Sequence, residues 1–211
     1  MTDASGLRVA GLLTSRLCHD LVGPLGAVSN GLELIAEDDA MAKEALALAQ
    51  GSAKRAAGRL QFFRYAFGAE GCEPNFGPGE ARSVALSLLN SGEVAIDWPE
   101  SRDVDLPTGV GRLLLNLTLL AVECLPRGGS VRVALGPNRI GIEATGPQAK
   151  LSGETKAAIA GIVSAAQLSA RTVVGYYVAQ LMTSLGGRLD LADEGAGTIR
   201  FQGVFNPPRS A

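Results

Sequence analysis

The chain has 211 residues, 46% of them hydrophobic, and a formal net charge of −2. This length suggests one or two domains, with enough apolar residues to build real cores. The small charge provides no general attraction to nucleic acid or to anionic membranes. Aromatic residues, at 5%, are too scarce for a base-stacking surface.

The cysteine and histidine content predicts free thiols and no metal site. Cys18, Cys72 and Cys124 lack the spacing of metal ligands, and one histidine, His19, cannot complete a usual zinc site. Free thiols and the absence of a secretory leader favour a cytoplasmic location. The longest apolar run, residues 113–122, is too short to span a bilayer.

A long amphipathic helix is predicted from the N-cap candidates at residues 2–5 to about residue 35 or 36. At about 100° per residue, its apolar side chains form one stripe roughly 100° wide. The stripe consists of Ala10, Leu13, Leu17, Leu21, Pro24, Val28, Leu32 and Ile35. His19 lies about 180° from the centre of the stripe, so we expect its imidazole to point away from the buried side.

The neighbours of His19 favour a role for this histidine. The residues that share its face are small, so another protein's backbone could approach the ring: Ser15, Gly23, Gly26 and Asn30. Pro24 has no N–H, which leaves the carbonyl of Asp20 without its helical donor. A neutral imidazole is a good nucleophile, and Asp20 could orient or polarise nearby groups. The alternative is an ordinary surface histidine without a function.

A second helix is predicted over about residues 40–67, antiparallel to the first because the connection is short. Its apolar residues alternate spacings of four and three, as in a heptad repeat. They are Ala42, Leu46, Ala49, Ala53, Ala56, Leu60, Phe63 and Phe67. Two helices cannot bury both apolar stripes, so we predict a homodimer whose hairpins form a four-helix bundle. The alternative is a hairpin that packs only on its own second domain.

The rest of the chain predicts a second domain after a linker. Residues 68–79 contain four glycines and two prolines, which is typical of a linker. Helices are expected at residues 80–90, 107–125, 152–163 and 170–185, and strands at 94–98, 130–135, 139–144, 188–192 and 198–204. This order indicates a two-layer α/β sandwich with a mixed or antiparallel sheet, and the whole chain is of the α+β class. We find no internal repeat, and expect disorder only in the last few residues.

Residues 19–25, His-Asp-Leu-Val-Gly-Pro-Leu, resemble the H-box of sensor histidine kinases, in which His, an acid, Leu, two variable positions, Pro and Leu follow in that order. The surrounding stretch from Cys18 to Ala27 resembles the H-box of the ChpT-type histidine phosphotransferases of bacteria. The likeness extends through residues 61–68 to a kinase-like second domain, and so covers nearly the whole chain. It implies a dimerisation and histidine phosphotransfer hairpin at residues 1–68, and a degenerate histidine-kinase ATPase-like domain at residues 79–211.

The second domain departs from the kinases at their nucleotide-binding motifs. By resemblance, Leu120 stands where the kinases carry the asparagine that binds magnesium. Ala144 stands where they carry the aspartate that binds adenine. Leucine cannot coordinate a hard cation, which requires oxygen ligands. The glycine-rich ATP lid that should precede residues 173–178 is also missing. We therefore expect no ATP or other cofactor, and a domain that serves as a scaffold or partner surface. The alternative is a domain kept only for folding and dimer stability.

The resemblance implies a phosphorelay protein of a two-component system. His19 would take a phosphoryl group from an aspartyl phosphate on a receiver domain, by family analogy on Nε2, and pass it to an aspartate of a second receiver. The Mg²⁺ would come from the receiver's acidic pocket. The family also implies a cell-cycle role, with a CckA-like hybrid kinase as donor and CtrA- and CpdR-like regulators as acceptors. The alternatives are an ATP-dependent histidine kinase and a non-catalytic regulatory binding module.

Residue roles follow from the same resemblance. His19 is expected to be the nucleophile and phosphate carrier, while Asp20 steers the imidazole or a neighbouring basic group. Gly23 stands where many kinases carry a Thr or Asn that positions a hydrolytic water, so weak phosphatase activity is expected. The expected receiver-docking residues are Leu12, Ser15, Arg16, Gly23, Gly26, Ala27 and Asn30. Basic side chains of the second helix either meet acidic receiver residues or form an ordinary solvated face: Lys54, Arg55, Arg59 and Arg64.

Overall fold

The structure is a computed structural model that describes residues 3–37, 39–73, 76–89, 93–100, 104, 106–195 and 197–206. In this part of the chain, six α-helices and one five-stranded sheet make an α+β fold, which confirms the predicted class. None of the described helices combines the length and the apolar character that crossing a bilayer requires.

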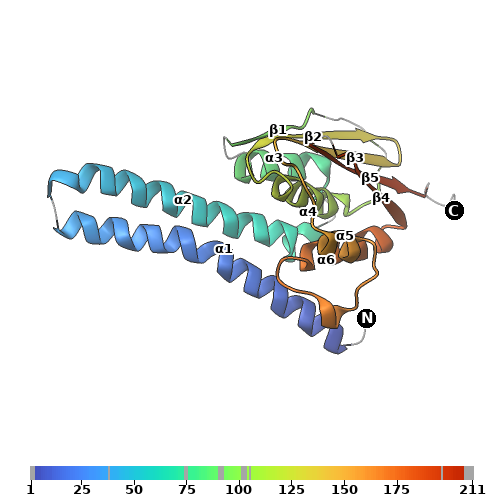
Figure 1. The fold of residues 1–211 in the computed structure, drawn as a ribbon, viewed down its shortest axis with the longest axis horizontal. Helices are drawn as coiled ribbons and strands as arrows, with labels where there is room; N and C mark the ends of the chain where they lie inside the picture. Colours follow the sequence, from blue (N-terminus) through green and yellow to red (C-terminus); the bar gives the residue numbers. More distant parts are fainter. Residues whose placement is uncertain are drawn as a thin grey trace.

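The first two helices form a long antiparallel hairpin that projects from one side of the second domain (Figure 1). Helix α1 spans Asp3–Glu37 and helix α2 spans Ala42–Ala66, with a 3₁₀ turn, η1, at Asp39–Met41 between them. Both helices agree with the predicted ones. Near the tip, a Cβ added at Gly31 would lie 3.0 Å from the Ala45 carbonyl oxygen and from Ala49 Cβ. Glycine at position 31 therefore allows the two backbones to approach closely.

The second domain contains one mixed sheet in the order β1-β2-β3-β5-β4. Strand β1 is parallel to β2, and the other neighbouring strands are antiparallel. The strands are β1 (Val94–Asp97), β2 (Gly129–Gly136), β3 (Arg139–Thr145), β4 (Gly187–Asp193) and β5 (Thr198–Phe205). The two predicted strand hairpins are β2–β3 and β4–β5.

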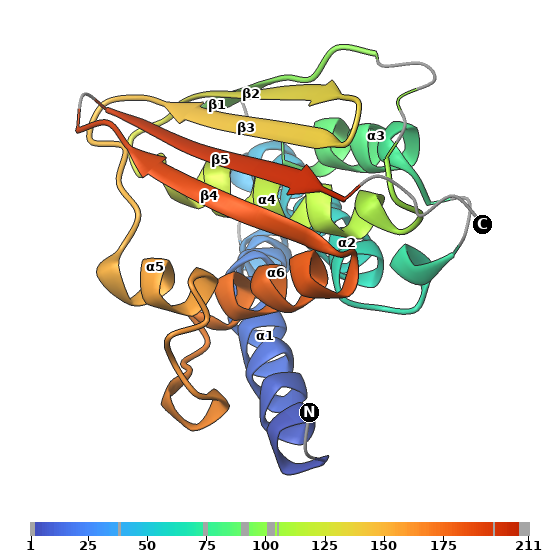
Figure 2. The same cartoon turned by 90° about the vertical axis from the view of Figure 1, so that its right-hand side faces the viewer.

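Four helices cover one face of the sheet and leave the other face open (Figure 2). They are α3 (Pro78–Leu88), α4 (Val110–Glu123), α5 (Gly153–Ile159) and α6 (Val173–Ser184). Strand residues alternate accordingly, so Val131 and Val133 are buried while Arg132 is exposed. This arrangement is the predicted two-layer sandwich.

Three predicted helices are longer than the observed ones, and one of them, expected at residues 170–185, is α6 at Val173–Ser184. The helix expected at residues 152–163 ends at Ile159, because Gly161 adopts a φ of +69° that an α-helix cannot continue through. A separate 3₁₀ turn, η3, follows at Ala165–Gln167. The helix expected from residue 107 begins at Val110, after Gly109 with a φ of +86°.

The segment predicted as a linker is packed against the end of α2 and against α4. It contains a 3₁₀ turn, η2, at Glu70–Cys72, and the ring of Phe76 stacks on Tyr65 with 5.0 Å between centroids. A Cβ at Gly71 would collide with the Tyr65 carbonyl, so glycine is required for this close turn. Residues 74 and 75 of this segment, and the chain end from residue 207 for which disorder was predicted, lie outside the described residues.

The end of α2 is fixed to α4 by hydrogen bonds. Asn116, which is fully buried, donates from Nδ2 to the Ala66 carbonyl at 2.9 Å, and Arg112 donates to the Gly68 carbonyl. Arg112 also donates to the hydroxyl of Tyr177 at 3.0 Å. Burial raises the pKa of Tyr177, and the nearby guanidinium partly offsets this effect. The base of the hairpin is therefore held by the second domain.

The three cysteines are free thiols, as predicted. Cys18 and Cys72 are exposed, whereas Cys124 is buried at the end of α4. Burial raises the pKa of the Cys124 thiol to about 12, so this group stays protonated at neutral pH.

Candidate functional site

His19 lies on the outer surface of the hairpin. Its side chain is 89% exposed, which agrees with its predicted position on the helix. The Nδ1 atom lies 3.4 Å from Oδ1 of Asp20, whose side chain is 27% exposed. A carboxylate only accepts hydrogen bonds, so this contact favours the tautomer that carries its proton on Nδ1 and its lone pair on Nε2.

Asp20 also approaches a basic group. Its Oδ2 lies 4.0 Å from Nε of Arg16, one helical turn earlier. The carboxylate thus contacts both kinds of group that it was expected to steer, the imidazole and a neighbouring cation.

Most of the predicted docking residues surround His19 on an open face. Ser15, Gly23, Gly26 and Asn30 are exposed, whereas Leu12 and Ala27 are partly buried. A Cβ added at Gly23 or Gly26 would meet no atom within 4 Å, so open space lies above both glycines.

Arg16 points toward the second domain. Its guanidinium pairs with Glu123 of α4 and donates to the Ala170 carbonyl at 3.4 Å, and its side chain is only 13% exposed. Burial lowers the pKa of Arg16, and the Asp20 carboxylate partly offsets this shift. In this conformation Arg16 links the histidine helix to α4.

A groove separates α1 from the second domain at Arg16, three residues before His19 in the chain. Its volume is about 560 Å³, and its lining residues are Arg16, Glu123, Pro126, Lys150, Leu151, Ser152, Thr155 and Arg171. Apart from Arg16, none of these residues was expected at the site from the sequence. No local pattern marks them, because the groove exists only once α1 lies against loops more than 100 residues away.

The positions that resemble nucleotide-binding residues lie inside the core. Leu120 is 1% exposed, and Ala144, Val173 and Val174 are completely buried. A Cβ at Gly175 would lie 3.1 Å from Cγ1 of Ile159, which means that α5 and α6 pack directly on one another. These buried side chains are all apolar, so they offer no oxygen or nitrogen to a ligand.

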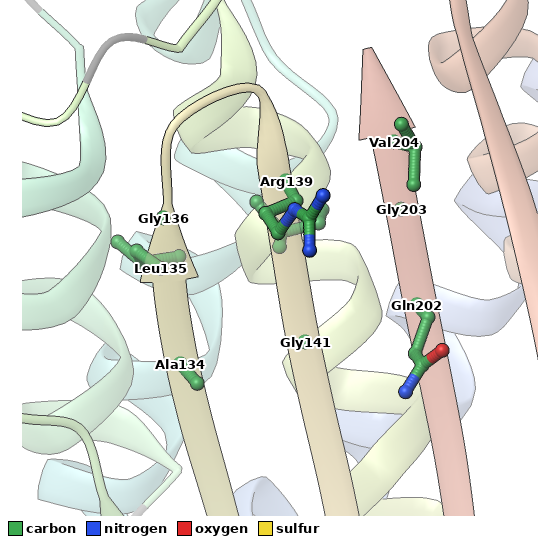
Figure 3. A pocket seen from close by; sticks show the side chains of 9 residues that line it. Ala134, Leu135, Gly136, Arg139, Gly141, Gln202, Gly203 and Val204 are labelled. Carbon is green, nitrogen blue, oxygen red and sulfur yellow. The ribbon is translucent and has the colours of Figure 1, made fainter.

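A second hollow lies on the open face of the sheet, over β2, β3 and β5 (Figure 3). Its volume is about 380 Å³, and Arg139 is the charged residue among its lining side chains. The helical layer separates it from the hairpin (Figure 2), so it is not part of the His19 site. Within the described residues, no three or more His, Cys, Asp or Glu side chains gather as metal ligands would.

Comparison with known proteins identifies the family. The family model for the histidine phosphotransferase C-terminal domain matches residues 78–197, which is more than half of the chain. The chain belongs to the histidine phosphotransferase family. The match lies within the second domain, whereas His19 lies on the hairpin.

Two relatives extend this result. Protein phosphotransferase ChpT from Brucella abortus (strain 2308) is 42% identical to this chain over 132 residues, which span 62% of each protein. A solved structure of a bacterial phosphotransferase is 32% identical, with a TM-score of 0.78. That match covers 93% of this chain and 96% of the other, so it includes both the hairpin and the second domain. Together they support the predicted ChpT-type membership.

We predict that the neutral ring of His19 carries its proton on Nδ1, because the Asp20 carboxylate accepts from that atom. Two-bond ¹H–¹⁵N correlation spectra measure the tautomer, and His19 provides one pair of ring nitrogens since it is the single histidine. Asp20→Ala should shift the ring toward the Nε2–H tautomer. Asp190→Ala, which removes a carboxylate paired with Arg188 on β4, serves as the control. A native ring protonated on Nε2 would contradict the assignment.

Proposed function

We propose that this protein is a phosphorelay histidine phosphotransferase that carries a phosphoryl group between the aspartates of two receiver domains through phosphohistidine at His19, without ATP. The observation that carries the proposal is the exposed imidazole of His19, with Asp20 beside its Nδ1, on a hairpin attached to a domain in which Leu120 and Ala144 are buried.

In the first step, the Nε2 lone pair of His19 attacks the phosphorus of an aspartyl phosphate on a donor receiver. The N–P bond forms as the P–O bond to the aspartate breaks, and the electron pair of that bond leaves with the aspartate carboxylate. The imidazole becomes a cation that keeps its proton on Nδ1. The Asp20 carboxylate, 3.4 Å from Nδ1, stabilises this cation and holds the ring in orientation.

In the second step, a carboxylate oxygen of an acceptor receiver attacks the same phosphorus, and the N–P electron pair returns to Nε2. Such transfers depend mainly on positioning and charge neutralisation. The Mg²⁺ that neutralises phosphoryl charge is supplied by the acidic pocket of the receiver. At Gly23 there is no side chain that could position a water against phosphohistidine, so hydrolysis is slow.

The packed interior of the second domain supports transfer without ATP. The buried side chains of Leu120 and Ala144 have no oxygen or nitrogen that could bind Mg²⁺ or the adenine amine. The direct packing of α5 on α6 at Gly175 also supports this proposal, because it leaves little space beside that glycine. Phosphate must then arrive on a protein that already carries it.

The partners are response-regulator receiver domains. A receiver seated on the open face around His19 meets Gly23 and Gly26, where its backbone can approach closely, and reaches the groove between α1 and the second domain. By family resemblance, the donor is a CckA-like hybrid kinase, the acceptors are CtrA- and CpdR-like regulators in cell-cycle control, and the protein is cytoplasmic.

The protein is also proposed to be a homodimer. In one chain, four leucines of the hairpin stay about half exposed: Leu32 of the α1 stripe, Leu46 and Leu60 of the α2 stripe, and Leu25, seven residues before Leu32. On α2, the exposed Ala53 lies midway between Leu46 and Leu60 in a heptad repeat. On α1, Leu25 lies about 120° around the helix from His19. Two hairpins joined through these stripes form a four-helix bundle that leaves both histidines accessible.

A phosphotransfer assay tests the proposed function. We expect the protein to acquire no label from radioactive ATP, and to acquire it from the labelled receiver domain of a CckA-type hybrid kinase. His19→Ala should abolish acceptance, because no other histidine is present. Label acquired from ATP would instead establish a histidine kinase, and label from neither source would establish a binding module.

A second prediction concerns docking. Gly26→Leu should block transfer from the receiver, because the new side chain fills open space where the partner's backbone must approach. The thermal unfolding midpoint should not fall, since position 26 has no neighbour within 4 Å and leucine favours helix more than glycine does. Gly11→Leu, also in open space on α1, is the control. Normal transfer by Gly26→Leu would refute this docking surface.

A third prediction concerns the dimer. Sedimentation should give twice the 21.7 kDa mass of one chain. The double change Leu46→Glu and Leu60→Glu should yield monomers, because it places charges in the apolar stripe. Leu48 is 47% exposed, similar to the 46% of Leu46, but lies about 200° away around α2, so Leu48→Glu should remain dimeric. A native monomer would contradict the bundle.

A further inference from the structure

One backbone carbonyl next to His19 lacks the hydrogen-bond donor that a helix normally supplies. Helix α1 runs unbroken from Asp3 to Glu37 with Pro24 inside it. Because proline has no N–H, the carbonyl of Asp20 has no helical donor, four residues earlier in the chain. A backbone carbonyl without a donor is normally satisfied by another group. Asp20 directly follows His19 in the chain. A group that binds the Asp20 carbonyl therefore restrains the helical turn that carries the imidazole.

The missing donor comes from the other helix. Nη1 of Arg59, on α2, donates to the Asp20 carbonyl oxygen at 2.5 Å, although the two residues are 39 positions apart. The guanidinium is permanently charged, so this is a charge-assisted hydrogen bond, which is stronger than one between neutral groups. Arg59 is exposed to solvent. Its guanidinium has further N–H groups beside the one that binds the Asp20 carbonyl.

Two arginines therefore meet Asp20 at different atoms. Arg16 approaches the carboxylate at 4.0 Å and is held by Glu123 of the second domain. Arg59 binds the carbonyl from α2. The orientation of Asp20 in turn determines where its Oδ1 meets Nδ1 of His19. The contact of Arg59 thus acts on the imidazole through the backbone of Asp20.

We propose that Arg59 is a positioning residue for phosphotransfer: by replacing the helical donor that Pro24 removes, it holds the turn of α1 that aims His19 at the incoming phosphorus. The inference rests on the proposed function and adds a residue to it. In-line transfer tolerates little misplacement of the nucleophile, so a turn that loses this bond should transfer slowly even with the receiver bound.

The test is a double-mutant cycle at Arg59 and Pro24. The labelled receiver domain of a CckA-type hybrid kinase is mixed with each variant, and single-turnover transfer is followed at increasing receiver concentration. Arg59→Met should lower the maximal rate about 10- to 100-fold and leave the half-saturating receiver concentration unchanged. Arg59→Lys keeps a charged donor, so most of the rate should be retained. Arg139→Met, on the sheet, is the matched control and should transfer normally.

Pro24→Ala isolates the mechanism, because alanine restores an N–H that can bind the Asp20 carbonyl within the helix. In the Pro24→Ala background, Arg59→Met should cost no more than about threefold, since the carbonyl no longer depends on Arg59. An equal loss in both backgrounds would overturn the proposal. Circular dichroism at the assay temperature shows that each variant is folded.

Two alternative roles of Arg59, receiver docking and hairpin stabilisation, predict different results in this assay. If Arg59 docks the receiver through acidic groups, Arg59→Met raises the half-saturating concentration and Pro24→Ala does not compensate, which overturns the proposal. If it only stabilises the hairpin, the unfolding midpoint falls while the maximal rate stays, which also overturns it. Native protein that accepts no label contradicts the proposed function itself, whereas normal transfer by Arg59→Met contradicts only the role of Arg59.

Discussion

The attachment of α2 to α4 is the constraint on which the rest of the structure depends. The last carbonyls of a helix have no donors within the helix, so they must be satisfied by other groups. Here Asn116 and Arg112 of α4 supply donors to the carbonyls of Ala66 and Gly68. Because α1 packs along α2, fixing the end of α2 also fixes where α1 meets the second domain. The pairing of Arg16 with Glu123 and the groove at Arg16 follow from that placement.

Helix α4 serves both the core and the hairpin. Leu120 is part of the core, and the buried Asn116 binds the hairpin. The polar groups of the helix thus hold a neighbouring domain, and its apolar groups fill the interior. The second domain thus holds the base of the hairpin that carries His19.

Asp20 connects the separate parts of the site. Its carboxylate contacts the imidazole of His19 and approaches Arg16, while its carbonyl accepts from Arg59. Through these three contacts the reactive ring is linked to the second domain by one arginine and to α2 by the other. Pro24 is central to this arrangement, because it is the residue that frees the carbonyl.

The sequence by itself determined the elements and the direction of the key side chain. Helical periodicity predicted both hairpin helices and the exposure of His19, and Pro24 predicted a carbonyl without a donor. Leu120 and Ala144 already departed from the nucleotide motif. Only the tertiary structure decided which partners these groups bind. Arg59 donates to the Asp20 carbonyl, and Glu123 pairs with Arg16, a residue that the sequence predicts on the docking face. Periodicity specifies which way a side chain points from its own helix. The partner it meets depends on how distant helices pack, and local sequence does not contain that geometry.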